Sequence, residues 1–277
     1  MKYLICSDFF IEDFVGGAAL NDEELYKILT NNGEEVELVK TNKISKDFLE
    51  KNKDSLFIIS NFFGIHPTIL PEFKNLKYVL YAHDYKFVQH TNPAVYEDFI
   101  IPKEELINVE FHQNAAAIIC QSSFQEDIYR KNIENIKTIN FSGNLWSDEV
   151  LGLLESLIET DKEEKVSVVK SPYPQKGVPE AIRTCIENQF NYDLVSDENY
   201  EKFLKKLSKN RGLAFIPLTP ETLSRIVVEC KMMNIKVFTT NLVGASYEPW
   251  FDKQGKELID VMRAKKQEIY DIIKSIK

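Results

Sequence analysis

Short apolar runs recur along the whole chain, and each is followed by a segment with helical periodicity. The runs are four or five residues long and lack strict apolar–polar alternation, which is typical of strands in a parallel sheet covered by helices on both faces. We therefore expect an α/β fold with doubly wound sheets. The first series of predicted strands comprises Tyr3–Cys6, Val36–Val39, Leu56–Ser60, Tyr78–Tyr81, Ala117–Cys120 and Thr138–Phe141.

The strand series pauses at Ser147–Lys165, an acidic stretch rich in helix-favouring residues, and then restarts. A chain of 277 residues is long enough for two domains of about 100 to 150 residues each. We expect two Rossmann-like domains, residues 1–146 and 147–277, with a cleft between them. The second series of predicted strands comprises Val166–Val169, Asp193–Val195, Leu213–Pro217 and Lys236–Thr239.

The last segment, residues 253–277, places apolar side chains at helical spacing and basic side chains elsewhere on the same helix. We expect a closing helix that packs on the C-terminal domain. The alternative is a cationic amphipathic helix that makes a weak peripheral contact with an anionic membrane.

Charge and cysteine usage limit the location and the partners of the protein. The formal net charge of −9 makes nucleic acid a less favoured partner. The four cysteines, which we expect to be small core residues in a reducing cytoplasm, lie far apart in apolar segments. The N-terminus reads as a strand and not as a signal peptide, and the apolar stretches are far too short to span a bilayer. The cysteines are Cys6, Cys120, Cys185 and Cys230.

Several classes of active site lack their sequence signatures. The histidines are scattered, no Asp-x-Asp pair ends a strand, and no Cys-x2-Cys spacing occurs, so we expect neither a metal nor another cofactor. The chain also lacks the Gly-x-Ser-x-Gly elbow of hydrolases and, after the first strand, the Gly-x-Gly-x-x-Gly of dinucleotide-binding enzymes.

The most informative stretch follows the predicted strand Leu213–Pro217 and carries two glutamates. Thr219 is placed to cap a helix and Pro220 suits its first position, which puts Glu221 in the first turn. Glu229 would then lie about 12 Å further along the same helix, a separation comparable to the length of a nucleotide diphosphate-sugar. Free amides at the helix start could bind phosphate oxygens. Taken alone, such a pair is more commonly a solvated helix face, so the surrounding sequence has to decide.

Residues Leu213–Gly244 resemble the C-terminal motif of retaining GT-B glycosyltransferases of the sucrose-synthase and glycogen-synthase type. In that motif a strand, a Glu-x7-Glu helix, a second strand and a Gly-rich turn follow one another. The resemblance implies that Glu221 contacts the transferred sugar and Glu229 the ribose. It also implies that the backbone at Leu223 and Ser224 binds the diphosphate.

Basic residues near both glutamates extend this resemblance. Lys170 and Lys176 look like the family's basic pair that neutralises the donor diphosphate, and Arg225 adds a positive charge near the helix start. Several departures are visible. The first basic residue is Lys where the family has Arg, one extra residue separates the basic pair, Asn234 and Lys236 replace the family's Gly and Pro, Gly244 stands alone where a Gly pair is usual, and one β/α unit is missing after Gly177.

The N-terminal half carries the resemblance over nearly the whole chain. Gly16 and Gly17 resemble the Gly-Gly loop that the family places against the donor phosphate. His83 ends a strand at the position where relatives carry a histidine facing the transferred sugar. The turn Phe141–Asn144 resembles the start of the interdomain crossing, which would be the hinge. The other histidines, His66, His90 and His112, match no family position.

Together these matches predict a metal-independent retaining glycosyltransferase, with His83, Glu221 and Lys176 as catalytic residues. A nucleotide-sugar would be the donor, and the acceptor would be an unidentified carbohydrate, lipid-linked or protein-linked molecule. One alternative is a phage-type enzyme that glucosylates modified DNA bases. Another is a non-catalytic GT-B-like module that binds a nucleotide-sugar or a protein, because the second domain is short.

Overall fold

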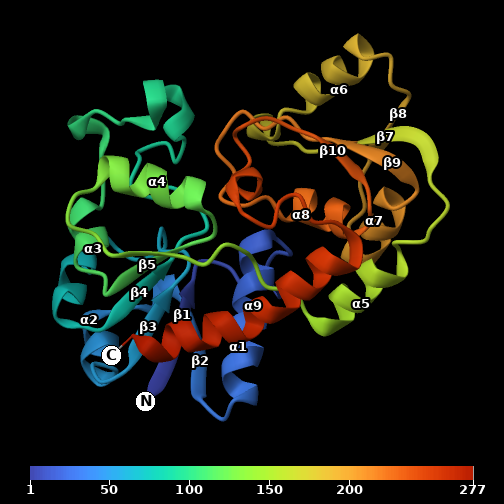
Figure 1. The fold of residues 1–277 in the computed structure, drawn as a ribbon. Helices are drawn as coiled ribbons and strands as arrows, with labels where there is room; N and C mark the ends of the chain where they lie inside the picture. Colours follow the sequence, from blue (N-terminus) through green and yellow to red (C-terminus); the bar gives the residue numbers. More distant parts are fainter. Residues whose placement is uncertain (277) are drawn as a thin grey trace. The chain divides into compact units, whose positions relative to one another are not determined.

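A computed structural model describes residues 1–276 and contains two parallel sheets (Figure 1). The contacts within the chain define two compact units. Unit 1 comprises Met1–Leu145 together with the residues from Lys265 onward, and unit 2 comprises Trp146–Ala264. The first crossing between the units therefore follows directly on the turn Phe141–Asn144, which the sequence predicted as the hinge.

The sheet of unit 1 has six strands in the order β2-β1-β3-β4-β5-β6, and every neighbouring pair is parallel. All six predicted strands of the N-terminal half are present. The strand order reverses at β1 and β3, because the chain runs from β1 outward to β2 and then back to β3. The strands are β1 (Lys2–Ser7), β2 (Glu35–Lys40), β3 (Leu56–Ile59), β4 (Tyr78–Tyr81), β5 (Ala117–Cys120) and β6 (Thr138–Asn140).

Helices cover both faces of this sheet, as the uninterrupted apolar strands predict. On one face, Ile5 and Ile58 pack with Leu25 of α1 and Ile273 of α9. On the other face, the ring of Tyr78 in β4 stacks on a ring of α3 at 5.0 Å between centroids. The helices of unit 1 are α1 (Gly17–Asn31), α2 (Lys46–Lys51), α3 (Val109–Gln113), α4 (Ser123–Asn132) and the second half of α9 (Gly255–Ser275), with short 3-10 turns η1 (Thr41–Lys43), η2 (Leu70–Asn75), η3 (Pro93–Val95), η4 (Glu97–Phe99) and η5 (Lys103–Glu105).

Unit 2 has a four-stranded parallel sheet in the order β10-β9-β7-β8. The first, second and fourth of these strands along the chain lie where the sequence predicted them. The third, predicted over Leu213–Pro217, begins and ends three residues earlier, at Asn210 and Ala214. The strands are β7 (Glu163–Val169), β8 (Tyr192–Val195), β9 (Asn210–Ala214) and β10 (Lys236–Phe238).

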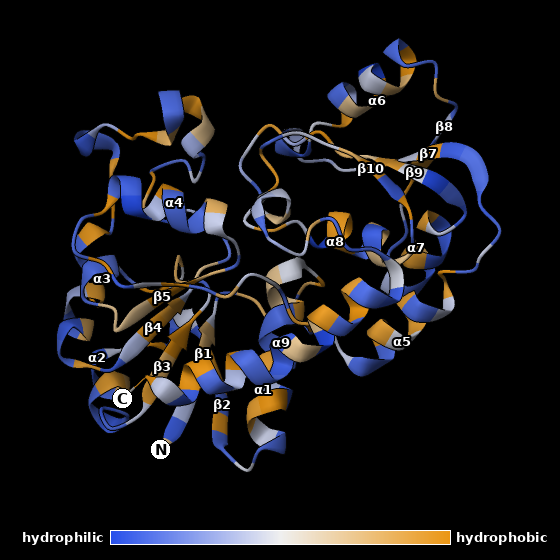
Figure 2. Ribbon diagram, viewed as in Figure 1, coloured by the Kyte–Doolittle hydropathy of each residue, from blue (hydrophilic) through white to orange (hydrophobic). Residues whose placement is uncertain are grey.

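The helices of unit 2 also divide between two faces. Ala181 and Cys185 of α6 pack on one face of the sheet, whereas α5, α7 and α8 contribute to the larger core on the other. The helices of unit 2 carry hydrophobic and hydrophilic residues in alternation along their length (Figure 2). The helices are α5 (Asp148–Ser156), α6 (Val178–Glu187), α7 (Tyr200–Leu207), α8 (Arg225–Met232) and the first half of α9, with 3-10 turns η6 (Pro174–Lys176) and η7 (Gly244–Tyr247).

The closing helix α9 contributes to both cores, whereas we expected it to pack on the C-terminal domain. Leu258 and Met262 are buried in the core of unit 2, and Ile269 and Ile273 are buried in the core of unit 1. The apolar stripe of the helix is therefore covered by protein along its length. A helix lying on a membrane through this stripe would need it exposed.

Two further expectations concern the chain as a whole. All four cysteines are buried thiols, which confirms that they are small core residues. Among the helices described for residues 1–276, none is both long enough and apolar enough to cross a bilayer.

Candidate functional site

The strand order of unit 2 places a switch point at the carboxyl end of its sheet, between the loop after β7 (residues 170–177) and the loop after β9 (residues 215–224). We refer to the region where these two loops meet as the crevice. From β7 the chain goes to β8 on one side, and β9 lies on the other side. After these loops the chain continues in opposite directions along the sheet, from β7 to β8 and from β9 to β10, and doubly wound sheets bind ligands at such a point. A backbone hydrogen bond joins the two loops, since the N–H of Leu218 donates to the carbonyl of Gln175 at 2.8 Å.

The structure brings two predicted site residues together in this crevice. Nζ of Lys176, the last residue of η6, lies 2.7 Å from Oε1 of Glu221. The lysine side chain is 38% exposed and the glutamate side chain 15% exposed. An ion pair with this much access to solvent contributes little to stability. Each of the two side chains can therefore exchange its partner for a group of an incoming ligand.

The loop that carries Glu221 is held by the Gly-containing turn predicted to follow β10. The Glu221 N–H donates to the carbonyl of Leu242 at 2.7 Å, and its own carbonyl accepts from the N–H of Gly244 at 3.0 Å. The N–H of Ala245 donates to the carbonyl of Leu223 at 3.0 Å. The turn at Gly244 therefore lies beside Glu221, as the order of the motif implies.

The predicted start of the helix was wrong, because α8 begins at Arg225 and not at Thr219 or Pro220. The backbone groups of Glu221 are used by the neighbouring turn, so they cannot join a helical ladder. Ser224, with φ +78°, then redirects the chain into α8. The two glutamates of the motif consequently lie on different elements, Glu221 on a loop and Glu229 in the second turn of the helix.

The start of α8 has the features of an anion-binding helix end. No side chain caps it and no acidic residue lies in its first turn. Ser224 is only 7% exposed, and in the part of the chain that the structure describes its hydroxyl has no hydrogen-bond partner. Free amides and the helix dipole both favour an anion at such an end. Leu223, by contrast, is fully buried, so only its backbone is available for the predicted phosphate contact.

Glu229, the predicted ribose ligand, is the centre of a buried network. Its Oε1 accepts from Nε1 of Trp146 at 2.9 Å and from the hydroxyl of Tyr200, and Nε of Arg225 lies 3.4 Å away. The guanidinium group of Arg225 also stacks over the ring of Trp146 at 4.4 Å. Burial, together with the nearby negative charge of Glu229, raises the pKa of Tyr200, which keeps its hydroxyl a proton donor.

Sequence reasoning missed Trp146 and Tyr200 as partners of Glu229. They lie 83 and 29 residues away from it in the sequence, and neither belongs to a motif. Arg225 contacts Glu229 and Trp146 within unit 2. Its position near a helix start did not predict these contacts.

Lys170 lies apart from the Lys176–Glu221 ion pair in the contacts that the structure shows. It is exposed at the end of β7 and lines a hollow of about 350 Å³ on the β8 side, together with Ser196 and Lys206. Neither Lys176 nor Glu221 lines that hollow. The two predicted basic residues therefore have different surroundings. Lys170 lies on the side of β8, and Lys176 contacts the loop that follows β9.

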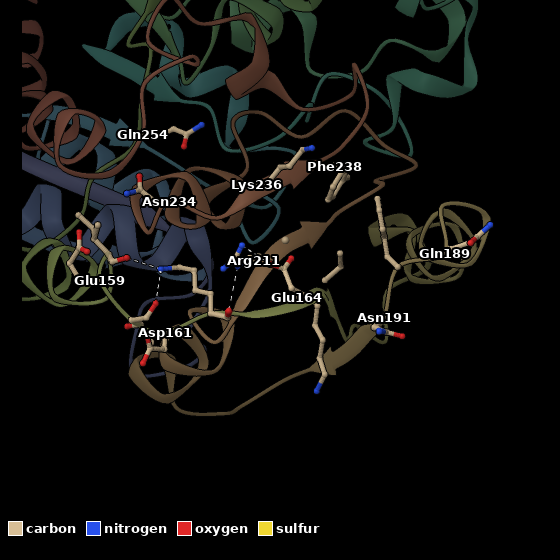
Figure 3. A pocket seen from close by; sticks show the side chains of 17 residues that line it. Glu159, Asp161, Glu164, Gln189, Asn191, Arg211, Asn234, Lys236, Phe238 and Gln254 are labelled. Carbon is tan, nitrogen blue, oxygen red and sulfur yellow. Dashed lines mark hydrogen bonds and ion pairs between the residues drawn. The ribbon is translucent and has the colours of Figure 1, made fainter.

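A larger hollow of about 1000 Å³ lies at the opposite, amino-terminal edge of the same sheet (Figure 3). None of the predicted site residues lines it. Its charged groups are largely satisfied within the protein: Arg211 pairs with Glu164 at 2.5 Å, and Nζ of Lys162 donates to the carbonyl of Ile158 at 2.7 Å. Parallel sheets bind ligands at their carboxyl edge, so size does not make this hollow the better candidate.

In unit 1, the predicted glycine loop opens helix α1. Gly16 is the N-cap, with an extended backbone at φ −139°, and Gly17 is the first helical residue. No side chain caps the helix and no acidic residue lies in its first turn. The exposed ring of Phe14 lies against Gly16.

His83 lies two residues beyond β4, where its ring has polar neighbours on both sides. Nδ1 is 2.6 Å from Nε2 of Gln121, and Nε2 is 3.6 Å from Oδ1 of Asp22. Asp22 in turn accepts from the hydroxyl of Ser60 at 2.7 Å. Sequence reasoning missed Gln121 and Asp22 beside the ring, and Ser60 beside Asp22. One signal was present, because Asp22 shares the apolar face of α1 with Leu25 three residues later.

The remaining histidines do not join this group. His112 is 1% exposed, donates from Nδ1 to the carbonyl of Asn108 at 2.7 Å, and lies among aromatic rings. Burial lowers the pKa of His112 to about 4, so it is a neutral core residue. Within residues 1–276, no group of three or more His, Cys, Asp or Glu side chains is arranged to hold a metal ion.

Gly177 fixes the geometry of the Lys176 loop. It adopts φ +61°, and a Cβ atom there would lie 1.7 Å from the carbonyl oxygen of Ile216. Any other residue would combine left-handed strain with a clash against backbone. We predict that Gly177→Ala lowers the free energy of unfolding by about 2–5 kcal/mol, as measured by urea denaturation.

The same substitution at Gly152 is a matched control. This glycine lies in the middle of α5 with no atom near the position of a Cβ. Gly152→Ala should stabilise the protein by about 0.5–1 kcal/mol. Equal stability of the two variants would show that the loop of Lys176 does not approach Ile216 as closely as described.

Comparison with solved structures finds the same fold in several other proteins. The structure of Anabaena Alr3699/HepE in complex with UDP and glucose has a TM-score of 0.54 at 14% identity, over 100% of this chain and 92% of that one. The lipopolysaccharide outer core galactosyltransferase WaaB, in its apo form, has a TM-score of 0.54 at 10% identity over 99% of both chains. An alpha-glucosyltransferase in complex with UDP and a 13-mer DNA containing an HMU base has a TM-score of 0.50 at 11% identity, over 98% of this chain and 90% of that one.

No protein-family model and no curated protein matches the sequence. The similarity at these identities is one of fold. Two parallel sheets with helices on both faces, shared with these structures over nearly their whole length, show that the chain has the GT-B fold of two Rossmann-like domains.

Proposed function

We propose that the protein is a glycosyltransferase that takes a sugar from a nucleotide-sugar donor and retains the configuration of the anomeric carbon. The observation that carries this proposal is the Lys176–Glu221 ion pair in the crevice of unit 2, beside the uncapped start of α8. The similar fold of structures that contain UDP with glucose, or UDP with DNA, supports it.

Donor binding would redistribute the charges of this crevice. The diphosphate takes Nζ of Lys176 as a cation, and its oxygens accept from the amides at the start of α8 and from the hydroxyl of Ser224. Glu221, released from the lysine, becomes the acceptor for hydroxyl groups of the sugar. Lys176 exchanges a carboxylate for a phosphate and Glu221 exchanges an ammonium group for hydroxyl donors, so neither side chain is left unpaired.

The ribose would be bound by Glu229, whose orientation is set before the donor arrives. Trp146 and Tyr200 both donate to its Oε1, so the carboxylate does not have to be ordered on binding. Arg225 adds positive charge at the start of α8, whereas Lys170, which lines the hollow on the β8 side, would need its loop to move to reach the diphosphate. For unit 1, the roles that the family resemblance implies for Gly16, Gly17 and His83 remain predictions.

The proposed reaction breaks the bond between the anomeric carbon and the phosphate oxygen and forms a bond to the acceptor oxygen on the same face of the sugar. The acceptor proton passes to the leaving phosphate, so no protein base is required. Charge grows on the diphosphate while the sugar becomes oxocarbenium-like. The protein then contributes by stabilising that charge and by orienting the sugar.

The acceptor that we propose is a carbohydrate, lipid-linked or protein-linked molecule in the cytoplasm. A second candidate is a modified DNA base, because the fold is shared with an enzyme solved in complex with UDP and DNA. The net charge of −9 opposes a polyanionic acceptor. Peripheral membrane contact, predicted from α9, would have to use a surface other than its buried apolar stripe.

Substitutions in the crevice test the donor site, with isothermal titration against a set of nucleoside diphosphates and their sugars. Lys176→Ala should weaken diphosphate binding by about 1.5–3 kcal/mol, the value of a charged hydrogen bond. Glu221→Gln should leave nucleoside diphosphate affinity unchanged or stronger, because it frees the lysine, yet it should lower sugar turnover.

Lys236→Ala is the control, since it removes an exposed cation at the amino-terminal edge of the same sheet. Its donor affinity should equal that of the wild type. Equal losses in Lys176→Ala and Lys236→Ala would indicate a general charge effect and contradict the proposed site. Tight donor binding without hydrolysis or transfer would instead identify a non-catalytic binding module.

We also propose that the transferase works without a metal ion, because Lys176, Arg225 and the helix amides can neutralise the diphosphate. Turnover should persist after dialysis against EDTA, and added manganese should change it by a few-fold at most. Activity that EDTA abolishes and manganese restores would overturn this part of the proposal.

A further inference from the structure

Four polar side chains converge at the carboxyl edge of the unit 1 sheet. Ser60 follows β3, His83 follows β4, and Gln121 follows β5, while Asp22 comes from helix α1 after β1. The strands β1, β3, β4 and β5 are neighbours in the sheet. The group therefore lies where the strand order reverses, the position at which such sheets bind ligands.

Asp22 is the unusual member of this group, because its carboxylate is fully buried. Oδ2 accepts from the hydroxyl of Ser60 at 2.7 Å. Oδ1 has no hydrogen-bond donor in the described part of the chain, and Nε2 of His83 lies 3.6 Å from it. A buried carboxylate oxygen without a partner costs stability and calls for an explanation.

Gln121 determines which nitrogen of His83 carries the proton. Its Nε2 lies 3.1 Å from the carbonyl oxygen of Ala82 and 2.6 Å from Nδ1 of His83. Because a carbonyl oxygen can only accept, the amide turns its NH₂ group toward Ala82 and therefore also toward the ring. Nδ1 is then an acceptor, and the proton of the neutral imidazole lies on Nε2, facing Asp22.

We propose that Asp22 is a positioning residue for the glycosyl transfer proposed above: with Gln121, it holds His83 as the neutral Nε2–H imidazole in one fixed orientation. The catalytic role of Asp22 rests on the proposed function. The tautomer of His83 does not depend on that function. The separation of 3.6 Å between Nε2 and Oδ1 is longer than a hydrogen bond, as catalytic hydrogen bonds often are in free enzymes, and we expect it to shorten in the substrate complex.

Nitrogen-15 NMR of the histidine rings in the full-length protein tests the tautomer without any substrate. We expect the wild-type ring of His83 to show a protonated Nε2 and an unprotonated Nδ1. Gln121→Glu replaces the donor by an acceptor, so it should move the proton to Nδ1. A wild-type ring protonated at Nδ1, or one that interconverts between tautomers, would overturn the proposal.

Turnover of a nucleotide-sugar tests the positioning role. Asp22→Asn keeps the shape of the side chain and should lower kcat roughly tenfold to a hundredfold, with the donor KM unchanged. Ser60→Ala, which removes one support of the carboxylate and alters the core less, should give a smaller loss in the same direction.

Glu24→Gln is the matched control on the same helix. Glu24 is also buried, but it pairs with Lys266 at 2.8 Å, so its variant should keep the wild-type kcat and tautomer. Equal kcat in Asp22→Asn and Glu24→Gln would refute the role of Asp22. A wild-type protein that binds no nucleotide-sugar would refute the proposed function instead, while the NMR result would still decide the tautomer.

Discussion

The candidate site depends on the close approach of two loops at the carboxyl edge of the unit 2 sheet. A hydrogen bond from Leu218 to Gln175 joins them, and the missing side chain of Gly177 lets their backbones meet. This contact brings Lys176 to Glu221. Without it, a lysine after β7 and a glutamate after β9 would be two unrelated surface charges, which is the ordinary reading of such residues.

The exposed and the buried charged side chains have different roles in the proposed function. The Lys176–Glu221 ion pair has access to solvent and can exchange partners with a ligand at little cost. Glu229 and Asp22 are buried, so each needs donors that remain in place. Tyr200 and Trp146 supply them for Glu229, and Ser60 supplies one for Asp22. Within unit 2, a fixed carboxylate at Glu229 together with an exchangeable ion pair is the arrangement expected of a preorganised electrostatic site.

The sequence allowed the architecture to be predicted because parallel strands covered on both faces are continuous apolar runs. Every predicted strand is present, and the glycine loop opens α1 as expected. The start of α8 was not predictable in the same way. Thr219 and Pro220 have the local preferences of a helix start, but pairing of Glu221 with the turn at Gly244 prevails over those preferences. Local propensity carries no information about a partner more than twenty residues away.

Long-range partners explain the remaining differences. Nothing in the spacing of Trp146 and Tyr200 shows that both point at Glu229. The sequence also does not show that α9 packs in the cores of both units, because this depends on which face of each sheet the other helices leave uncovered. Asp22 is the exception, because a carboxylate on the apolar face of an amphipathic helix is visible in the sequence alone. Such a residue is a sound reason to look for a buried functional group.

The central claim is that the protein transfers a sugar with retention, using the leaving diphosphate as the proton acceptor. Proton NMR of the first-formed product from an α-linked nucleotide-sugar, with either an added acceptor or water, measures the anomeric configuration directly. The account predicts the α-anomer as the first product, linked to the added acceptor or released as the free sugar when water is the acceptor. A β-linked first product would contradict it, and with it the roles assigned to Lys176 and Glu221.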